Sequence, residues 1–445
     1  TTGVQHVLIG GLAGDALTEG NSNIAIGKGA LTADTLGSNA VAIGKEALAN
    51  QNFTSATTNY NVAVGYEAGK AVTTGILNTL IGGLAGDALT DADQNIAMGY
   101  AALSLDTLGS NSVAIGPYAL GTQNFTSATN SYNVAIGSSA GYAITTGIKN
   151  TLIGGLAGDN LNTSSSNTAV GYAALSAEDS HGSNTAIGYG TLTTQNAGAT
   201  AYNVAVGHNA GTAVTTGINN TLIGALAGDA LTDADANVAV GQSALTTDTK
   251  GNKNTAVGHS ALEAQNFTTS TSSYNTAIGS DAGKAITTGV QNTILGSSAG
   301  DALTDADYNV AFGKSALSAD TLGSKSTALG TFCLEAQNFT SATDTYNTAV
   351  GYNAGTAVTT GVQNTLLGGL AGDALTEGGH NIVLGIAALT TDTKGSKSVA
   401  IGDSALANQN FTSATDSQNT AVGHYAGLNV TTGINNCIFG AYAAD

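Results

Sequence analysis

The sequence predicts an all-β fold, a parallel β-solenoid in which one short coil is repeated 25 times. The motif Asn-x-Ala-(Val/Ile)-Gly recurs along the whole chain, and its glycine falls at 25 positions from Gly10 to Gly440. Of the 24 intervals between these glycines, eighteen equal 17, five equal 21 and one equals 19. Glycine makes up 61 of the 445 residues, with one proline and no tryptophan. Such self-similarity at a short period is the sequence signature of a solenoid, whose core is linear.

The intervals follow a fixed order that defines a larger unit. Three short intervals are followed by one long interval, which gives a 72-residue superrepeat of four coils, shortened to 70 once. Residues 61–77, 78–94, 95–111 and 112–132 are one example of each coil type. We therefore expect one continuous solenoid over residues 1–445. Neither end has a polar capping coil, so we expect the chain to be a segment of a longer fibre.

Each coil is predicted to contain one short strand that ends at the motif glycine. The residue before this glycine is apolar in every coil, as at Val64 and Ile81, and the residue before that is alanine in most coils. Neighbouring strand residues point to opposite faces, so both faces of the strand carry apolar side chains. A solenoid buries only its interior. The second apolar face therefore predicts packing against other chains, most simply in a parallel homotrimer.

An asparagine lies four residues before the motif glycine in 20 of the 25 coils. Stacked coils would place these amides about 4.8 Å apart, in register to hydrogen-bond along the axis. We interpret the column as an asparagine ladder that stabilises the scaffold. The ladder is represented by Asn23, Asn61, Asn95, Asn133, Asn203, Asn275, Asn347 and Asn419.

The charge of the chain excludes several functions. The formal net charge is −19, and all 11 basic residues are lysines. Nucleic acids and anionic bilayers both require clustered cations, so neither is an expected partner. No apolar run is long enough to span a membrane. Cys333 and Cys437 lie six coils apart, roughly 29 Å at strand spacing, so we expect no disulfide between them.

The 21-residue coil carries a loop that reads QNFTSAT or a close variant, usually followed by a tyrosine. Aromatic rings repeated on a polar surface can stack on sugar rings or bury themselves in a neighbouring chain. Alternatively, the phenylalanine packs over the edge of the solenoid and the tyrosine closes the loop. These candidate contacts are Phe53, Tyr60, Phe125, Tyr132, Phe267, Tyr274, Phe339, Tyr346 and Phe411.

Pairs of aspartates in a D-x-D-x-N spacing are the weak candidates for calcium. They lack the glycine at position six and the glutamate at position twelve of an EF-hand loop, which excludes that kind of site. Calcium bridging between neighbouring coils or chains stays open, and we expect no other cofactor. The candidates are Asp91, Asp93, Asp233, Asp235, Asp305 and Asp307.

The sequence offers no pattern for catalysis, so we expect the protein not to be an enzyme. A pair of catalytic carboxylates requires one coil to differ from the rest, whereas here the carboxylates repeat with the scaffold. The histidines share no spacing and show no Cys or acidic partner, so no metal site or catalytic triad is predicted from them. They are His6, His181, His208, His259, His380 and His424.

Short segments of the chain resemble a known family. The segments NSVAIGPYAL (residues 111–120) and SVAIGDSAL (residues 398–406) look like the SVAIG repeats in the YadA-like heads of trimeric autotransporter adhesins. The longer NTAVGYNAGTAVTTGVQNTLLG (residues 347–368) resembles repeats in bacteriophage tail fibres. The resemblance covers essentially the whole chain and implies a left-handed parallel β-roll of three chains. It also implies display outside a cell or virion for attachment.

These observations together predict a non-enzymatic fibre shaft or adhesin on a virion or bacterial surface. Its partners would be two further copies of itself and a host-surface or matrix receptor, which could be a glycan. One alternative is a self-assembling extracellular filament or matrix protein. Another is a glycan-binding module that uses the Phe/Tyr loops.

Overall fold

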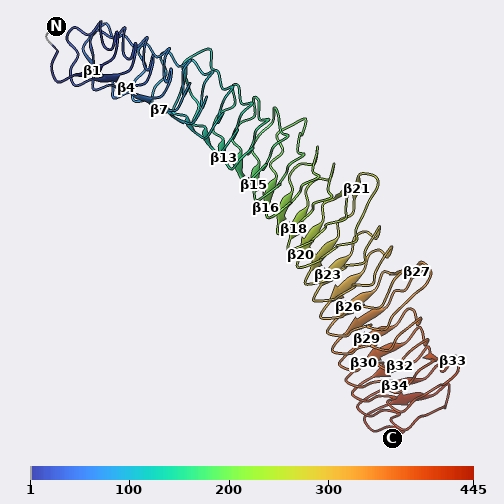
Figure 1. The fold of residues 1–445 in the computed structure, drawn as a ribbon. Coiled ribbons are helices and arrows are strands. Elements are labelled where there is room, and N and C mark those ends of the chain that lie inside the picture. The colour runs from blue at the N-terminus through green and yellow to red at the C-terminus, as the bar shows by residue number, and fades with distance from the viewer. Residues whose placement is uncertain (1–2, 445) are drawn as a thin grey trace. The chain divides into compact units, whose positions relative to one another are not determined.

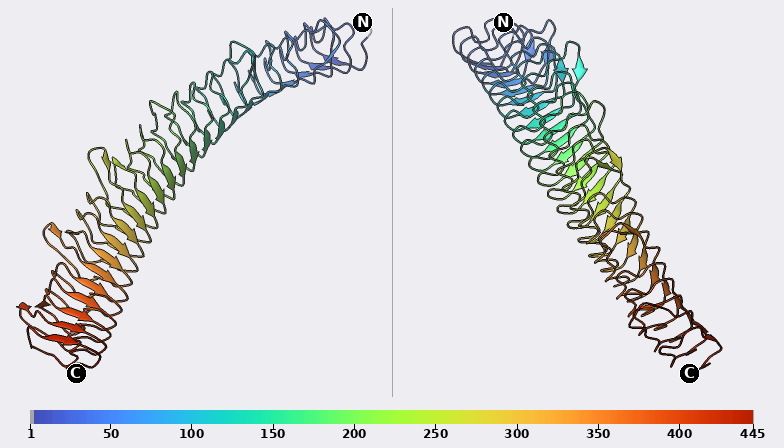
Figure 2. Two further views of the ribbon diagram at one scale, coloured as in Figure 1. Left: turned by 180° about the vertical axis from the view of Figure 1, so that it is seen from behind. Right: turned by 90° about the vertical axis from the view of Figure 1, so that its right-hand side faces the viewer.

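The computed structural model describes residues 3–444, and within them every regular element is a β-strand (Figure 1). Short strands pair in parallel in 25 successive coils, so the predicted all-β parallel solenoid is confirmed. No helix in this range is long and apolar enough to cross a membrane. The chain divides into two compact units, Thr1–Asn219 and Asn220–Asp445. In each unit the main-sheet strands follow one side of the stacked coils (Figure 2).

The first unit holds the main-sheet strands up to residue 206. They are β1 (Val7–Ile9), β2 (Ile24–Ile26), β4 (Val41–Ile43), β6 (Val62–Val64), β7 (Thr79–Ile81), β8 (Ile96–Met98), β10 (Val113–Ile115), β12 (Val134–Ile136), β13 (Thr151–Ile153), β14 (Thr168–Val170), β15 (Thr185–Ile187) and β16 (Val204–Val206). Each strand pairs with the next coil residue by residue, as in Val113 with Val134. At two places in this unit, a second and shorter pair of parallel strands connects neighbouring coils in addition to the main sheet. These small ladders are β3 (Gly37–Ser38) with β5 (Thr57–Thr58), and β9 (Gly109–Ser110) with β11 (Thr129–Asn130).

The second unit repeats the arrangement. Its main-sheet strands are β17 (Thr221–Ile223), β18 (Val238–Val240), β20 (Thr255–Val257), β22 (Thr276–Ile278), β23 (Thr293–Leu295), β24 (Val310–Phe312), β26 (Thr327–Leu329), β28 (Thr348–Val350), β29 (Thr365–Leu367), β30 (Ile382–Leu384), β32 (Val399–Ile401), β34 (Thr420–Val422) and β35 (Cys437–Phe439). Its small ladders are β19 (Gly251–Asn252) with β21 (Thr271–Ser272), β25 (Gly323–Ser324) with β27 (Thr343–Asp344), and β31 (Gly395–Ser396) with β33 (Thr415–Asp416).

The interior of each unit is built from small and medium apolar side chains. The middle residue of a main-sheet strand, such as Ala63 or Leu80, is fully buried. Leucines at the opposite corner, such as Leu103 and Leu120, complete the core. Burying apolar area contributes about 25 cal/mol per Å², so these columns supply much of the stability of a coil. Of the two apolar faces predicted for each strand, only the alanine or leucine face is the interior.

The motif glycine is needed because neighbouring coils approach closely at the end of each strand. Gly65 has a φ of 147°, a region that residues with a side chain rarely adopt. A Cβ at this position would also lie 2.3 Å from the carbonyl oxygen of Gly82 in the next coil. Any larger residue would therefore strain its own backbone and push the coils apart.

The asparagines form a ladder in which hydrogen bonds join asparagine side chains to backbone groups. The Nδ2 of Asn61 donates to the carbonyl of Gly75 at 2.7 Å, which ties together two corners of one coil. Its Oδ1 accepts the backbone N–H of Asn78 in the next coil at 2.9 Å. An amide with both bonds closes its own coil and holds the following one, rather than bonding only to another amide. Buried asparagines of this kind include Asn23, Asn61, Asn95, Asn133, Asn203, Asn275, Asn347 and Asn419.

Candidate functional site

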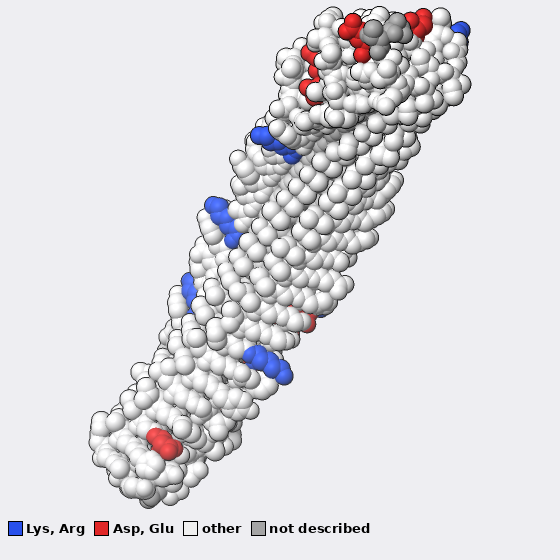
Figure 3. All heavy atoms as spheres, turned by 90° about the vertical axis from the view of Figure 1, so that its left-hand side faces the viewer, with Lys and Arg blue, Asp and Glu red and all other residues white. Residues whose placement is uncertain are grey.

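The outer face of the main sheet is an uncharged surface in each unit. No main-sheet strand contains a charged residue, and the first and third positions are Val, Ile, Thr, Leu or other uncharged residues. Ile153 and Ile187 in the first unit are 38% and 37% exposed, and Ile223 in the second is 39% exposed. In the view of Figure 3, lysines and acidic residues are few and are separated by uncharged surface. Apolar surface that continues over many coils is typical of a face that contacts another molecule.

The phenylalanines of the 21-residue coils point into the protein. Their exposed fractions are 5% to 7%, which leaves no ring surface for a sugar. They are Phe53, Phe125, Phe267, Phe339 and Phe411. Among the two interpretations of these loops, this burial favours packing of the phenylalanine over the solenoid edge.

A buried aspartate from the preceding coil holds each of these loops. The Oδ1 of Asp106 accepts the backbone N–H groups of Gly109 at 3.0 Å and Phe125 at 3.2 Å, and its Oδ2 accepts Nε2 of Gln123 at 2.5 Å. The Oε1 of Gln123 then accepts Nδ2 of the ladder residue Asn133 at 2.8 Å. We call the Asp, Gly, Gln and Phe of such a set the latch. The other latch aspartates are Asp34, Asp248, Asp320 and Asp392.

The loop tyrosines lie on the surface, in contrast to the phenylalanines. Their exposed fractions run from 51% to 57%. The hydroxyl of Tyr274 accepts a hydrogen bond from Nζ of Lys253 at 3.0 Å, and the same ammonium lies 5.0 Å from the ring centroid. The exposed loop tyrosines are Tyr60, Tyr132, Tyr274 and Tyr346.

The paired aspartates make hydrogen bonds within the scaffold. The carboxylate of Asp91 accepts the hydroxyl of Thr74, and that of Asp93 accepts the backbone N–H of Ile76 at 2.8 Å. In the second unit, Asp305 accepts the hydroxyl of Thr288 at 2.6 Å, and the equivalent Asp307 accepts a backbone N–H. Asp233 and Asp235 also have partners. Coil-to-coil hydrogen bonding thus accounts for these pairs without a bound ion.

Two rows of exposed aromatic rings lie on the first unit, and they are absent from the candidates predicted above. The ring centroids of Tyr100 and Tyr118 are 5.5 Å apart, and those of Tyr118 and Tyr142 are 6.3 Å apart, both edge to face. Tyr118 and Tyr142, with Ser139, line an open hollow of about 340 Å³. In the second row, Tyr172 stacks on Tyr189 and Tyr189 on His208, at 5.7 and 5.4 Å. In the second row each aromatic residue directly follows a motif glycine, as in Gly171-Tyr172, whereas in the first row only Tyr100 does.

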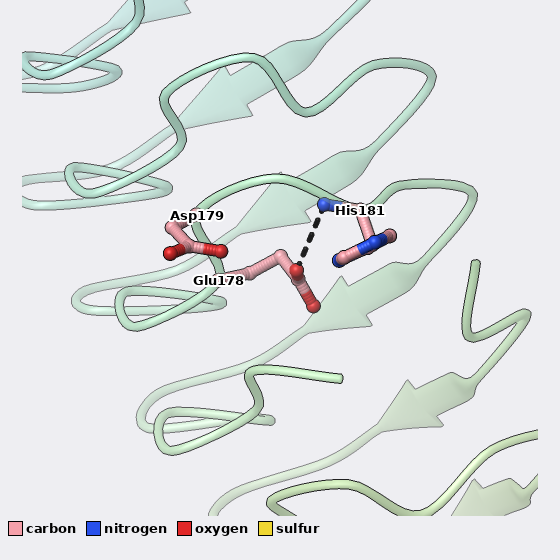
Figure 4. Close-up of side chains that lie close together, drawn as sticks. All are labelled: Glu178, Asp179 and His181. Atoms are coloured by element: carbon pink, nitrogen blue, oxygen red, sulfur yellow. Dashed lines mark hydrogen bonds between the residues drawn. The ribbon is translucent and has the colours of Figure 1, made fainter. Parts of the chain in front are cut away.

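One superrepeat of the first unit brings a histidine and two acidic residues together. One ligand atom from each of Glu178, Asp179 and His181 lies within 4.8 Å of the others (Figure 4). The prediction that no histidine has an acidic partner is therefore wrong for His181, and also for His424, whose Nδ1 lies 3.8 Å from Oδ2 of Asp403. The predicted lack of a shared position is wrong too, because His208, His259 and His424 each directly follow a motif glycine. Among residues 3–444, no other group of three such side chains comes this close. The signal was available in the short segment EDSHG, the place where the superrepeat departs from its pattern.

The two cysteines differ in exposure, since Cys333 is buried and Cys437 is exposed. Both are free, in agreement with the prediction that no disulfide joins them. Burial raises the pKa of the Cys333 thiol to about 12, so very little nucleophilic thiolate exists at neutral pH.

The fold and its repeated hydrogen-bond ladders define a β-solenoid repeat protein. No family model, curated protein or solved structure matches the chain.

Proposed function

We propose that this protein is a non-enzymatic fibre shaft, displayed on a virion or cell surface, that holds a binding tip at a distance and contributes to attachment. The observation that carries this proposal is the repetition of the same coil-to-coil hydrogen bond along the chain. The Asn61 to Asn78 bond recurs as Asn78 to Asn95 and as Asn95 to Ser112, so load along the axis is shared by equivalent bonds. The resemblance to trimeric autotransporter adhesin heads and phage tail fibres supports the same role.

The proposed shaft is a parallel homotrimer joined through the outer face of the main sheet. This face is continuous within each unit, lacks charge and exposes Ile153 and Ile187 by more than a third. Aliphatic columns on three such faces would bury one another and leave the loops outside. Burial of the exposed third of each such isoleucine would contribute about 0.5–1 kcal/mol, so the contact must extend over many coils to be stable.

The oligomer is tested by measuring the native mass of the chain, whose monomer is 43.5 kDa. We expect the mass of three chains for the wild type and a smaller species for the double variant Ile153→Lys/Ile187→Lys. The matched control is Thr126→Lys/Ser127→Lys, which adds the same charge to an exposed loop and should leave the mass unchanged. A soluble, stable monomer of the wild type would contradict the trimer.

The filament alternative differs from the shaft in the segments that flank the repeats. A distinct non-repetitive segment at one end of the complete gene product supports a shaft with a tip. Repeats that continue to both ends, together with fibres that lengthen with protein concentration in electron micrographs, would support the filament and overturn the shaft.

The exposed tyrosine row supports a second candidate function, contact with a glycan. Tyr100, Tyr118 and Tyr142 present rings one coil apart beside an open hollow, whereas the loop phenylalanines are buried. Successive rings at this spacing suit stacking on successive sugar rings. A glycan array on the purified chain tests the idea. Binding should be lost in Tyr118→Ala/Tyr142→Ala and kept in the control Tyr60→Ala/Tyr132→Ala, and absence of binding by the wild type would dismiss it.

A further inference from the structure

The group at Glu178, Asp179 and His181 lies where one superrepeat differs from the others at several positions together. In the regular superrepeat, the latch consists of Asp106, Gly109, Gln123 and Phe125. The irregular one has Glu178, His181, Gln195 and Ala197 at the same places, and its loop is two residues shorter. The aspartate has become a glutamate, the glycine a histidine and the phenylalanine an alanine.

These changes depend on one another because they share one space. A Cβ added to Gly109 would lie 2.1 Å from Oδ2 of Asp106 and 2.7 Å from the ring of Phe125. A histidine can therefore occupy this position only if the acidic side chain is redirected and the aromatic ring is removed. Glu178 and Ala197 meet both requirements, so the imidazole enters a space that the latch otherwise fills.

The replacement leaves hydrogen-bonding atoms without partners. The Oε1 of Glu178 accepts the backbone N–H of His181 at 3.1 Å, as Figure 4 shows, but Oε2 is buried and unpaired. The Nδ1 of His181 and the Nε2 of Gln195 are also buried without a partner. The regular latch satisfies all its polar groups at this place. A polar group that is buried without a partner destabilises the fold, so several of them together point to a ligand.

We propose that Glu178, Asp179 and His181 bind one divalent transition-metal ion, for which Zn²⁺ is the appropriate probe. The Oε2 of Glu178 is fully buried and the Nδ1 of His181 lies beside it, while Asp179 is exposed and free to close over the ion. One imidazole and two carboxylates form an N/O ligand set that suits zinc. Calcium and magnesium prefer oxygen ligands alone, so the histidine favours zinc over them.

The ligand atoms must move closer for this ion to bind. They lie within 4.8 Å of one another, whereas bonds of about 2.0–2.2 Å to one ion bring neighbouring ligands to roughly 3.3 Å. Rotation of the exposed Asp179 side chain brings its carboxylate closer, and small side-chain rotations of Glu178 and His181 supply the rest. Three protein ligands leave a fourth position for water, as in other zinc sites with an open position.

The site is tested by titrating ZnCl₂ into the chelator-treated full-length chain in a calorimeter. We expect one ion per chain, and at least a tenfold loss of affinity in His181→Ala and in Glu178→Gln. The matched control is His259→Ala, which removes an exposed histidine of the second unit and should leave the affinity unchanged. The melting temperature should rise with zinc in the wild type and in this control only.

Further measurements separate a lost site from a lost fold. Circular dichroism checks each variant, and Asp179→Asn, a change in an exposed side chain, should weaken zinc binding in a chain that is still folded. Co²⁺ bound to the wild type should give a visible spectrum that His181→Ala lacks. The proposal is overturned if the wild type binds no zinc, or if folded variants of all three ligands bind it as well as the wild type, which would indicate an adventitious ion only. Either outcome leaves the fibre-shaft proposal untouched.

Discussion

The regular latch around Asp106 and its counterpart around Glu178 occupy the same place in two superrepeats of the first unit. In the regular latch the carboxylate accepts three hydrogen bonds and the loop phenylalanine is buried. In the counterpart, Glu178 and His181 keep unpaired atoms in the interior. The main sheet is unaffected, because β14, β15 and β16 keep their residue-by-residue pairing through this region. The backbone ladder is thus the same in both superrepeats, whereas the side chains of the latch differ.

The largest expected effect comes from placing the histidine in a regular latch. Gly109→His should destabilise the protein locally by more than about 4 kcal/mol, because the new side chain overlaps the Asp106 carboxylate and the Phe125 ring. Hydrogen exchange of the β9–β11 amides measures the loss. The triple variant that adds Asp106→Glu and Phe125→Ala should recover part of it. Equal exchange in the single variant and the wild type would refute the steric coupling of these positions.

A second variant removes only the ring. Phe125→Ala should lower the free energy of unfolding by about 3–4 kcal/mol, because it leaves a cavity at a buried position. This superrepeat has no histidine to fill the cavity. The control Tyr132→Ala, in the same loop but exposed, should cost less than about 1 kcal/mol. Urea unfolding of both variants gives the comparison, and equal losses would mean that the ring does not hold the loop.

Burial raises the pKa of Glu178 to about 7, so the two superrepeats should differ in their response to pH. The folded state holds this proton more tightly than the unfolded state, whose glutamate titrates near 4.5. Protonated Glu178 therefore contributes its full stabilisation of the folded state below about pH 4.5, and this contribution is lost as the pH rises to about 7.

The free energy of unfolding should fall by about 2–3 kcal/mol over this pH range. The measurement is made with a chelator present, so that no metal ion is bound. Glu178→Gln, which keeps a neutral side chain at every pH, should abolish the dependence at this site. The side chains of Asp179 and His181 lie close to Glu178, so Asp179→Asn and His181→Ala are compared over the same range. A dependence that persists in Glu178→Gln would assign it to another group.

The smallest expected effect concerns the loop tyrosine. Lys253→Ser gives the second unit the residue type found at the equivalent Ser183, and it removes the exposed contact with Tyr274. Exposed pairs of this kind contribute at most a few tenths of a kcal/mol, so the unfolding midpoint should barely move. A loss above about 1 kcal/mol would show that the tyrosine closes the loop through this lysine.

The sequence was sufficient to predict the coil, its strand and its asparagine column, because all three depend on spacing within one coil. Gly65 and Asn61 repeat at fixed positions, and stacking follows from the period alone. The direction of Phe125 was not predictable in this way. Its burial depends on Asp106, which belongs to the preceding coil and meets it only after the coils stack.

The grouping at His181 escapes prediction for a related physical reason. The other histidines share no position in the coil with His181, whereas Gly109 does share its position. Alignment of the superrepeats by coil position shows that the phenylalanine is replaced by Ala197 in the same superrepeat in which the glycine is replaced by His181. The unpaired atoms of Glu178 and His181 are visible only in three dimensions.

The hydrogen bonds of the latch also limit how such a gene can grow. Asp106 lies in the third coil of a superrepeat and its partners Gln123 and Phe125 lie in the fourth, while Asn133 continues into the next superrepeat. Duplication of a single coil would separate the latch aspartate from the glutamine of the next coil, whose side-chain amide donates a hydrogen bond to the buried carboxylate. Duplication of four coils copies donor and acceptor together. Inherited changes in the number of coils should therefore occur in whole superrepeats, and natural variants of this chain that differ in coil number should differ by segments equivalent to residues 61–132.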